Sequence, residues 1–145
     1  MHTEKFQEYL MSMDTKQRLQ KGKEYGEKRV AQMLDEIRKR NGMMYVAVDG
    51  EQVVGFSACV VELQDAIAQL DNIPSLPGVI LELYVEDVYR GKGVGKMLMQ
   101  QMESFLKEKG CDQVWVEVFG PNVQAKAFYE MCGYEVRDFV MGKEI

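Results

Sequence analysis

The sequence is poor in the residues that bind metals or form disulfides. Its one histidine is His2, and its three cysteines, Cys59, Cys111 and Cys132, have no C-x-x-C spacing. A zinc site needs several such ligands close together, and a disulfide framework needs paired cysteines. We therefore expect no metal site and reduced, buried thiols.

Long hydrophobic runs are missing as well. No apolar run approaches the roughly 20 residues of a membrane span, and the charged start MHTEKFQEYLMSMD lacks the apolar region of a secretory signal. A composition of 46% hydrophobic and 28% charged residues is typical of a soluble globular protein. We predict a cytoplasmic protein without a membrane partner. The net charge of -5 argues against nonspecific nucleic-acid binding.

The length of 145 residues predicts a single domain, residues 1–145, with one core and one site. Apolar spacing predicts a helix from about Thr3 to Gln20 and a second one around Val30 to Ile37. MMYVAV and QVVGFSACVVEL flank Asp49-Gly50, a pair that suits a type I′ hairpin turn.

The second half of the chain alternates between strand and helix patterns. Residues 64–77 are expected to form a loop with a helical turn. The remaining elements predicted are strands over 78–86, 111–119 and 134–141, and helices over 92–109 and 122–131. A strand, a helix and a strand in this order imply a crossover between parallel neighbours, and the whole pattern indicates a mixed α/β (α+β) fold.

Glycines at every second position, Gly91, Gly93 and Gly95, stand where a strand passes into a helix. Free amide groups and the positive end of the helix dipole meet there, and glycine lets an anion come close to the backbone. We expect mobile positive charge here from Arg90, Lys92 and Lys96. The stretch VYRGKGVGKMLMQ therefore predicts an anion site.

Two common phosphate motifs do not fit this stretch. A Walker A loop would need a hydroxyl at Met97 and a glycine at Arg90, and a dinucleotide fingerprint would need a glycine at Lys96. R-x-x-G-x-G does fit, as Arg90, Gly93 and Gly95.

These residues resemble the GNAT superfamily of acetyl-CoA-dependent N-acetyltransferases, whose [QR]-x-x-G-x-[GA] loop holds the coenzyme A pyrophosphate. NVQAKAFYEMCGYE is similar to the family's later N-x-x-A-x-x-[FL]-Y-x-x-x-G-[FY] segment, so that the resemblance covers Leu81 to Glu135. It implies a central, mostly antiparallel sheet, splayed beside Leu83 to Val85, with flanking helices and acetyl-CoA in the opening. The cofactor-binding residues implied are Leu83, Tyr84, Val85, Arg90, Gly91, Lys92, Gly93, Val94, Gly95, Lys96 and Asn122. Asn122 is also a helix cap by residue type.

The chain departs from the family pattern at its start, which is helical where members often have a strand, and at Asp87, where many have proline.

Acetyl transfer to an amine needs a base, because an alkylamine with a pKa of about 10.4 is mostly protonated at neutral pH. Glu117 is one candidate, since a strand would place it on one face with Trp115 and Phe119, and EVFGPN resembles members that acetylate protein N-termini. The alternative for Glu117 is an ordinary solvated glutamate.

Glu82 is the second candidate, on a face expected to include Ile80 and Tyr84. The alternative interpretation of Glu82 is again a solvated or salt-bridged strand glutamate.

The resemblance implies that the backbone N–H of Val85 stabilises the developing oxyanion and that Tyr129 is the acid that protonates the leaving thiolate. The alternative interpretation of Tyr129 is that it is a residue of the hydrophobic core.

The function expected is transfer of the acetyl group of acetyl-CoA to a primary amine of a small molecule or a protein, by direct attack. A catalytically silent coenzyme A-binding sensor or interaction domain is the alternative; it would need neither Tyr129 nor a base. A nucleotide hydrolase would lack its metal ligands. A homodimer is among the assemblies that the sequence allows, and the sequence does not select an oligomeric state.

Overall fold

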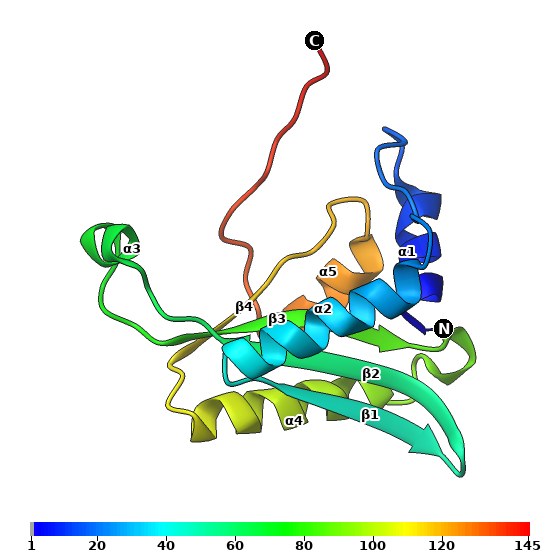
Figure 1. The fold of residues 1–145 in the computed structure, drawn as a ribbon, viewed down its shortest axis with the longest axis horizontal. Coiled ribbons are helices and arrows are strands. Elements are labelled where there is room, and N and C mark those ends of the chain that lie inside the picture. The colour runs from blue at the N-terminus through cyan, green and yellow to red at the C-terminus, as the bar shows by residue number, and fades with distance from the viewer. Residues whose placement is uncertain (1) are drawn as a thin grey trace.

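The computed structural model describes residues 2–145 and contains a four-stranded sheet with helices on both faces (Figure 1). The strand order is β1-β2-β3-β4, antiparallel except for the parallel pair β3 and β4. This arrangement confirms the mixed α+β fold with a mostly antiparallel sheet.

The first half of the chain comprises α1 (His2–Met13), α2 (Tyr25–Lys39), the hairpin strands β1 (Met43–Asp49) and β2 (Gln52–Val61), and α3 (Ala66–Asp71). The second half comprises β3 (Pro77–Val85), the short 3-10 helix η1 (Asp87–Tyr89), α4 (Val94–Glu108), β4 (Gln113–Val116) and α5 (Val123–Met131).

Two hydrophobic clusters lie on opposite faces of the sheet, because neighbouring strand residues point to opposite sides. On one face Phe56 and Ala58 of β2 pack with Met33 of α2. On the other face Cys59 of β2 packs with residues of α4 and α5. α1 and α2 thus cover one face of the sheet, and α4 and α5 cover the other.

The first helix is shorter than the sequence predicts, ending at Met13 instead of near Gln20. The carboxylate of Asp14 accepts hydrogen bonds from the backbone N–H groups of Lys16, Arg18 and Leu19, at 3.1, 2.6 and 2.7 Å. A short acidic side chain that bonds its own following backbone competes with the helix and turns the chain.

The hairpin is confirmed, but with a different turn. Asp49 pairs with Gln52, so the two loop residues are Gly50 and Glu51. Gly50 has a φ of 59°, and Glu51 is not among the residues with positive φ. A positive φ at the first loop residue alone is a feature of type II′ turns, not of the predicted type I′.

β3 contains a bulge that the strand pattern does not reveal. Cys59 of β2 pairs with Ile80, whereas its neighbour Ala58 pairs with Glu82, so that Leu81 is an extra residue. The bulge shifts the alternation of side chains. Ile80 therefore packs in the α4 cluster while Tyr84 packs in the α2 cluster, and the expected common face of Glu82 with Ile80 is wrong.

The end of the sheet also differs from the prediction. β4 stops at Val116 instead of Phe119, so Glu117 and Phe119 lie beyond the strand and the expected strand face with Trp115 is not formed. The strand predicted over residues 134–141 is absent, and the C-terminal segment runs away from the sheet (Figure 1). An isolated segment without a paired neighbour gains no ladder of hydrogen bonds.

Across residues 2–145, no helix is both long and apolar enough to cross a membrane.

Candidate active site

The glycine loop lies between β3 and α4, as predicted. Gly91 and Gly93 have φ angles of 71° and 87°, in the left-handed region that favours glycine, and Gly93 is the residue before the first turn of α4. A Cβ added to either glycine would meet no atom within 4 Å, so there is open space above the loop. The first N–H groups of a helix lack partners inside the helix. The loop therefore offers donors to an approaching anion.

Gly95 has a different role from its neighbours. A Cβ at this position would lie 3.3 Å from Cε2 and Cζ of Phe128 on α5. The missing side chain thus lets the start of α4 pack closely against the aromatic ring of α5.

Arg90 is not the mobile positive charge that the sequence predicts. Its Nε donates to the backbone oxygen of Val85 at 2.9 Å, and its Nη1 lies 2.9 Å from Oδ1 of Asp87. The guanidinium also stacks over the ring of Tyr9, 4.9 Å from its centroid. Arg90 therefore ties the glycine loop to the end of β3 and to α1. Of the three cations expected here, Lys92 and Lys96 are the exposed ones.

β3 and β4 part beside the glycine loop. The last parallel pair joins Ile80 and Val116, and β3 then continues to Val85 with no described strand on that side. The splayed opening that the resemblance implies is therefore present beside Leu83 to Val85. A strand edge without a neighbour has unpaired N–H and C=O groups, apart here from the carbonyl of Val85, which accepts from Arg90. This part of β3 can therefore bind an extended ligand through its backbone.

Tyr129 lies in the core of the α4 and α5 face. The residue is 9% exposed, and its ring makes edge contacts with Phe128 and Tyr134 at centroid distances of 5.3 and 5.7 Å. Burial raises the pKa of Tyr129 to about 12. The phenol therefore keeps its proton throughout the neutral range. Tyr134, its neighbour, donates its own hydroxyl to Glu103 at 2.9 Å.

Asn122 caps α5, as its residue type predicts. The residue is 5% exposed, and its side-chain oxygen accepts a hydrogen bond from the backbone N–H of Ala125 at 3.1 Å. The cap fixes where α5 begins and so places Tyr129 two turns further along the helix.

The two candidate bases lie in different surroundings. Glu82 is buried on the face covered by α2, with only 5% of its side chain exposed, and its Oε1 accepts from Nε of Arg29 at 2.7 Å. Burial raises the pKa of Glu82, and the nearby guanidinium of Arg29 opposes part of that rise. Glu117 is exposed and follows the last residue of β4.

Arg29 is the partner of Glu82, and the sequence reasoning did not identify it. It precedes Met33 and Ile37 by four and eight residues, so it shares their helix face. Met33 is 1% exposed and Ile37 packs against the same cluster. A charged residue on a face that points to the core was the available signal, because a buried charge needs a partner.

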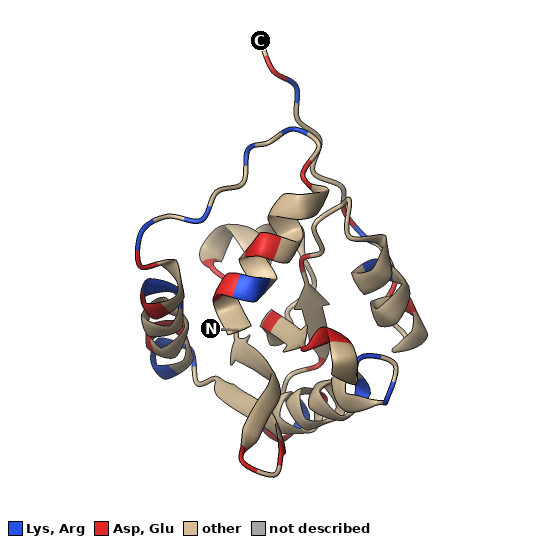
Figure 2. Cartoon of the chain, turned by 90° about the vertical axis from the view of Figure 1, so that its right-hand side faces the viewer, with Lys and Arg blue, Asp and Glu red and all other residues tan. Residues whose placement is uncertain are grey.

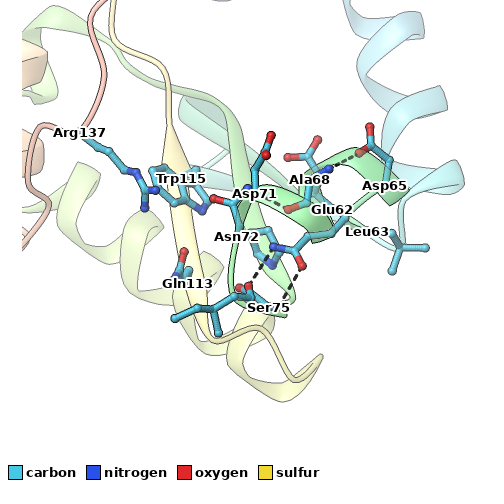
Figure 3. Close-up of a pocket in the computed structure, with 13 residues that line it drawn as sticks. Glu62, Leu63, Asp65, Ala68, Asp71, Asn72, Ser75, Gln113, Trp115 and Arg137 are labelled. Carbon is cyan, nitrogen blue, oxygen red and sulfur yellow. Dashed lines mark hydrogen bonds between the residues drawn. The ribbon is translucent and has the colours of Figure 1, made fainter.

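A cavity of about 630 Å³ lies elsewhere, at the other end of the sheet. Residues around α3 line it together with Pro77, Gln113, Trp115 and Arg137, and Figure 3 shows Arg137 beside the Trp115 ring. Pro77 begins β3, whereas the glycine loop follows the end of the same strand. The cavity is therefore separate from the glycine loop and from the unpaired edge of β3.

Comparisons with known proteins agree with this geometry. The family model described as "Acetyltransferase (GNAT) family" matches residues 7–134. The [ribosomal protein bS18]-alanine N-acetyltransferase of Haemophilus influenzae is 34% identical over 105 residues, which are 70% of this chain and 63% of that protein. The aminoglycoside N(6')-acetyltransferase type 1 of Stenotrophomonas maltophilia is 30% identical over 96 residues, 66% of this chain and 60% of that protein. The chain thus spans less than two thirds of these relatives.

A similar fold is found in the structure of an aminoglycoside N-acetyltransferase in complex with CoA. Its TM-score is 0.65 at 18% identity, and the match covers 82% of this chain and 87% of that one. At this identity the likeness concerns the fold alone. Because the family model extends over most of the sequence, the chain belongs to the acetyltransferase (GNAT) family.

Proposed function

We propose that the protein transfers the acetyl group of acetyl-CoA to a primary amine by direct attack of the amine. The observation that carries this proposal is the unpaired edge of β3 from Leu81 to Val85, which lies next to the glycine loop at the start of α4. A strand edge that can bind an extended ligand therefore lies next to a loop that can bind phosphate. Family membership supports the same reaction.

The residues around this opening fit acetyl-CoA. The free space above Gly91 and Gly93 and the first N–H groups of α4 would hold the pyrophosphate, with Lys92 and Lys96 as exposed countercharges. The backbone of Leu83 to Val85 would bond the extended arm. When bound, acetyl-CoA supplies an acetyl group activated as a thioester.

Three protein groups would then act on the reaction. Glu117 or Glu82 would take a proton from the amine, and the backbone N–H of Val85 would stabilise negative charge developing on the carbonyl oxygen. The hydroxyl of Tyr129 would give a proton to the departing sulfur, since burial keeps it protonated at neutral pH.

The acceptor is proposed as a small-molecule amine or a protein amine. The names of the relatives cover both kinds, a ribosomal protein alanine and an aminoglycoside. Acidic and basic segments alternate along the ribbon in Figure 2, and the net charge of the chain is -5, which does not favour nonspecific binding to nucleic acid.

A panel assay tests this function. The purified full chain is incubated with acetyl-CoA and, in turn, with spermidine, kanamycin, free lysine and a peptide with an N-terminal alanine, while thiol release is recorded. We expect one class of amine to raise thiol release above the rate without amine, with an acetylated product seen by mass spectrometry. Binding of acetyl-CoA in calorimetry without thiol release from any acceptor would instead favour the silent coenzyme A-binding domain.

A further inference from the structure

Glu82 has an oxygen without a partner at a position where the sheet opens. Its Oε2 is buried and has no hydrogen-bond partner among the described residues, whereas its Oε1 is bonded to Arg29. A buried carboxylate oxygen left without a donor is costly, and such atoms mark sites that a ligand or a water completes. Glu82 lies just beyond Ile80, the last residue of β3 that pairs with β4.

The geometry of the ion pair holds Glu82 in one orientation. Nε of Arg29 donates to Oε1 at 2.7 Å, while Nη1 of the same guanidinium donates to Oε1 of Gln32 at 3.1 Å, one turn further along α2. The guanidinium is planar and rigid, so two bonds in different directions fix its position. α2 thus presents Arg29 to Glu82 from a defined place.

We propose that Arg29 is a positioning residue for Glu82: it holds Oε1 from α2 and leaves Oε2 facing the amine of the acceptor. This inference rests on the proposed function, because it assigns the acceptor amine to the face covered by α1 and α2, opposite to α4. Under this assignment the acceptor is a basic amine, and its N–H groups donate hydrogen bonds to Oε2 of Glu82.

The charges around Glu82 determine how its ionisation responds to a change at Arg29. Among the described residues, the titratable groups that interact with Glu82 are Arg29 and Tyr25, both on α2. Burial raises the pKa of Glu82 and Arg29 lowers it. Loss of the guanidinium therefore raises the pKa further, and the ionised form, which accepts a proton from the amine, becomes populated only at higher pH.

The test compares Arg29→Met, Arg29→Lys and the control Arg38→Met, which removes an exposed arginine from the same helix. We expect Arg29→Met to move the acid limb of the pH–rate profile up by about one pH unit or more, since a close opposite charge shifts a carboxyl pKa by roughly 1–3 units. Arg29→Lys should restore most of the profile, and Arg38→Met should leave it unchanged. Calorimetry should show unchanged acetyl-CoA affinity in all three variants.

A second readout does not depend on turnover. Carbon-13 NMR of labelled glutamate carboxyls, assigned with Glu82→Gln, should show Glu82 titrating at higher pH in Arg29→Met than in the unmodified chain. The same titration midpoint in a folded Arg29→Met protein overturns the proposal, as does a pH–rate profile that Glu82→Gln leaves intact. Absence of turnover in the unmodified chain would instead contradict the proposed function, and the NMR titration would still decide the role of Arg29.

Discussion

At the scale of single residues, burial separates the groups proposed for catalysis. Tyr129 and Glu82 are buried on opposite faces of the sheet, whereas Glu117 lies in solvent beyond β4. A buried phenol keeps its proton and a buried carboxyl holds its proton more tightly, so both groups change their chemistry through their surroundings. Each of them can be tested by a substitution that alters one atom or one charge.

For Tyr129, the informative change is Tyr129→Phe, which keeps the packing of the ring and removes the proton donor. We expect turnover to fall by about 10²-fold while acetyl-CoA affinity changes little, because the hydroxyl would act only in the transition state. Steady-state kinetics and calorimetry measure the two quantities. Tyr134→Phe is the matched control, since it removes a neighbouring hydroxyl that is bonded to Glu103. A Tyr129→Phe protein with unaltered turnover would make Tyr129 a core residue.

The two glutamates can be separated by their amides. If Glu117 is the base, Glu117→Gln should lower the rate at neutral pH by roughly 10²- to 10⁴-fold, with partial recovery at high pH as more acceptor becomes neutral. Glu82→Gln should then mainly raise the Michaelis constant for a cationic acceptor, an effect that salt weakens.

The opposite outcome identifies Glu82 as the base. Burial raises its pKa, so its acid limb would lie above the usual range of a glutamate, with the rate increasing as pH rises through it. Glu82→Gln would then remove that limb, and Glu117→Gln would leave the pH–rate profile intact.

At the scale of elements, local signals in the sequence were reliable where one residue type serves one backbone geometry. Asn122 caps α5, and Gly110, with a φ of 86°, follows the last turn of α4. The features that local signals did not reveal depend on contacts with residues far away in the sequence. The bulge at Leu81 appears only in the register between β2 and β3, and the end of β4 depends on where β3 turns away.

The same contrast between local and distant signals applies to the residues of the candidate site. The place of the glycine loop before α4 and of Tyr129 within α5 was predictable, because motif spacing carries both, while their roles stay predictions. Arg29 was not identified, since its importance comes from Glu82 on another element, 53 positions along the chain. The structural role of Arg90 depends likewise on the backbone oxygen of Val85 and on Tyr9 of α1.

A prediction at this scale concerns the start of α4. Gly93→Val places a branched side chain where the pyrophosphate would lie, so acetyl-CoA affinity should fall by about 10- to 100-fold, the loss expected when hydrogen bonds to a charged group disappear. Because Gly93 has a φ of 87°, the substitution also strains the backbone. Gly110→Val is the matched control, with a φ of 86° at the other end of the same helix and equally open space. If calorimetry finds the same affinity in both variants, the loop is not the phosphate site.

At the scale of the whole molecule, the sheet separates the candidate groups onto two faces. α4 and α5 on one face hold the glycine loop and Tyr129, and α1 and α2 on the other face hold Arg29 against Glu82. The C-terminal segment is the exception, since Phe139, Val140 and Met141 are 83%, 101% and 91% exposed. The homodimer that the sequence allows stays a prediction.

Binding at this opening should stabilise the whole fold. A ligand present at 100 times its dissociation constant, and bound to the folded state alone, adds about 2.7 kcal/mol to the free energy of unfolding. For a chain of this size we therefore expect acetyl-CoA to raise the melting temperature by roughly 5–10 °C, measured by circular dichroism. Gly110→Val should melt lower than the unmodified chain but gain the same increment. Gly93→Val should also melt lower and gain little, because strain is common to both variants and the phosphate contact is lost in one. An equal gain in the two variants would place the coenzyme away from α4.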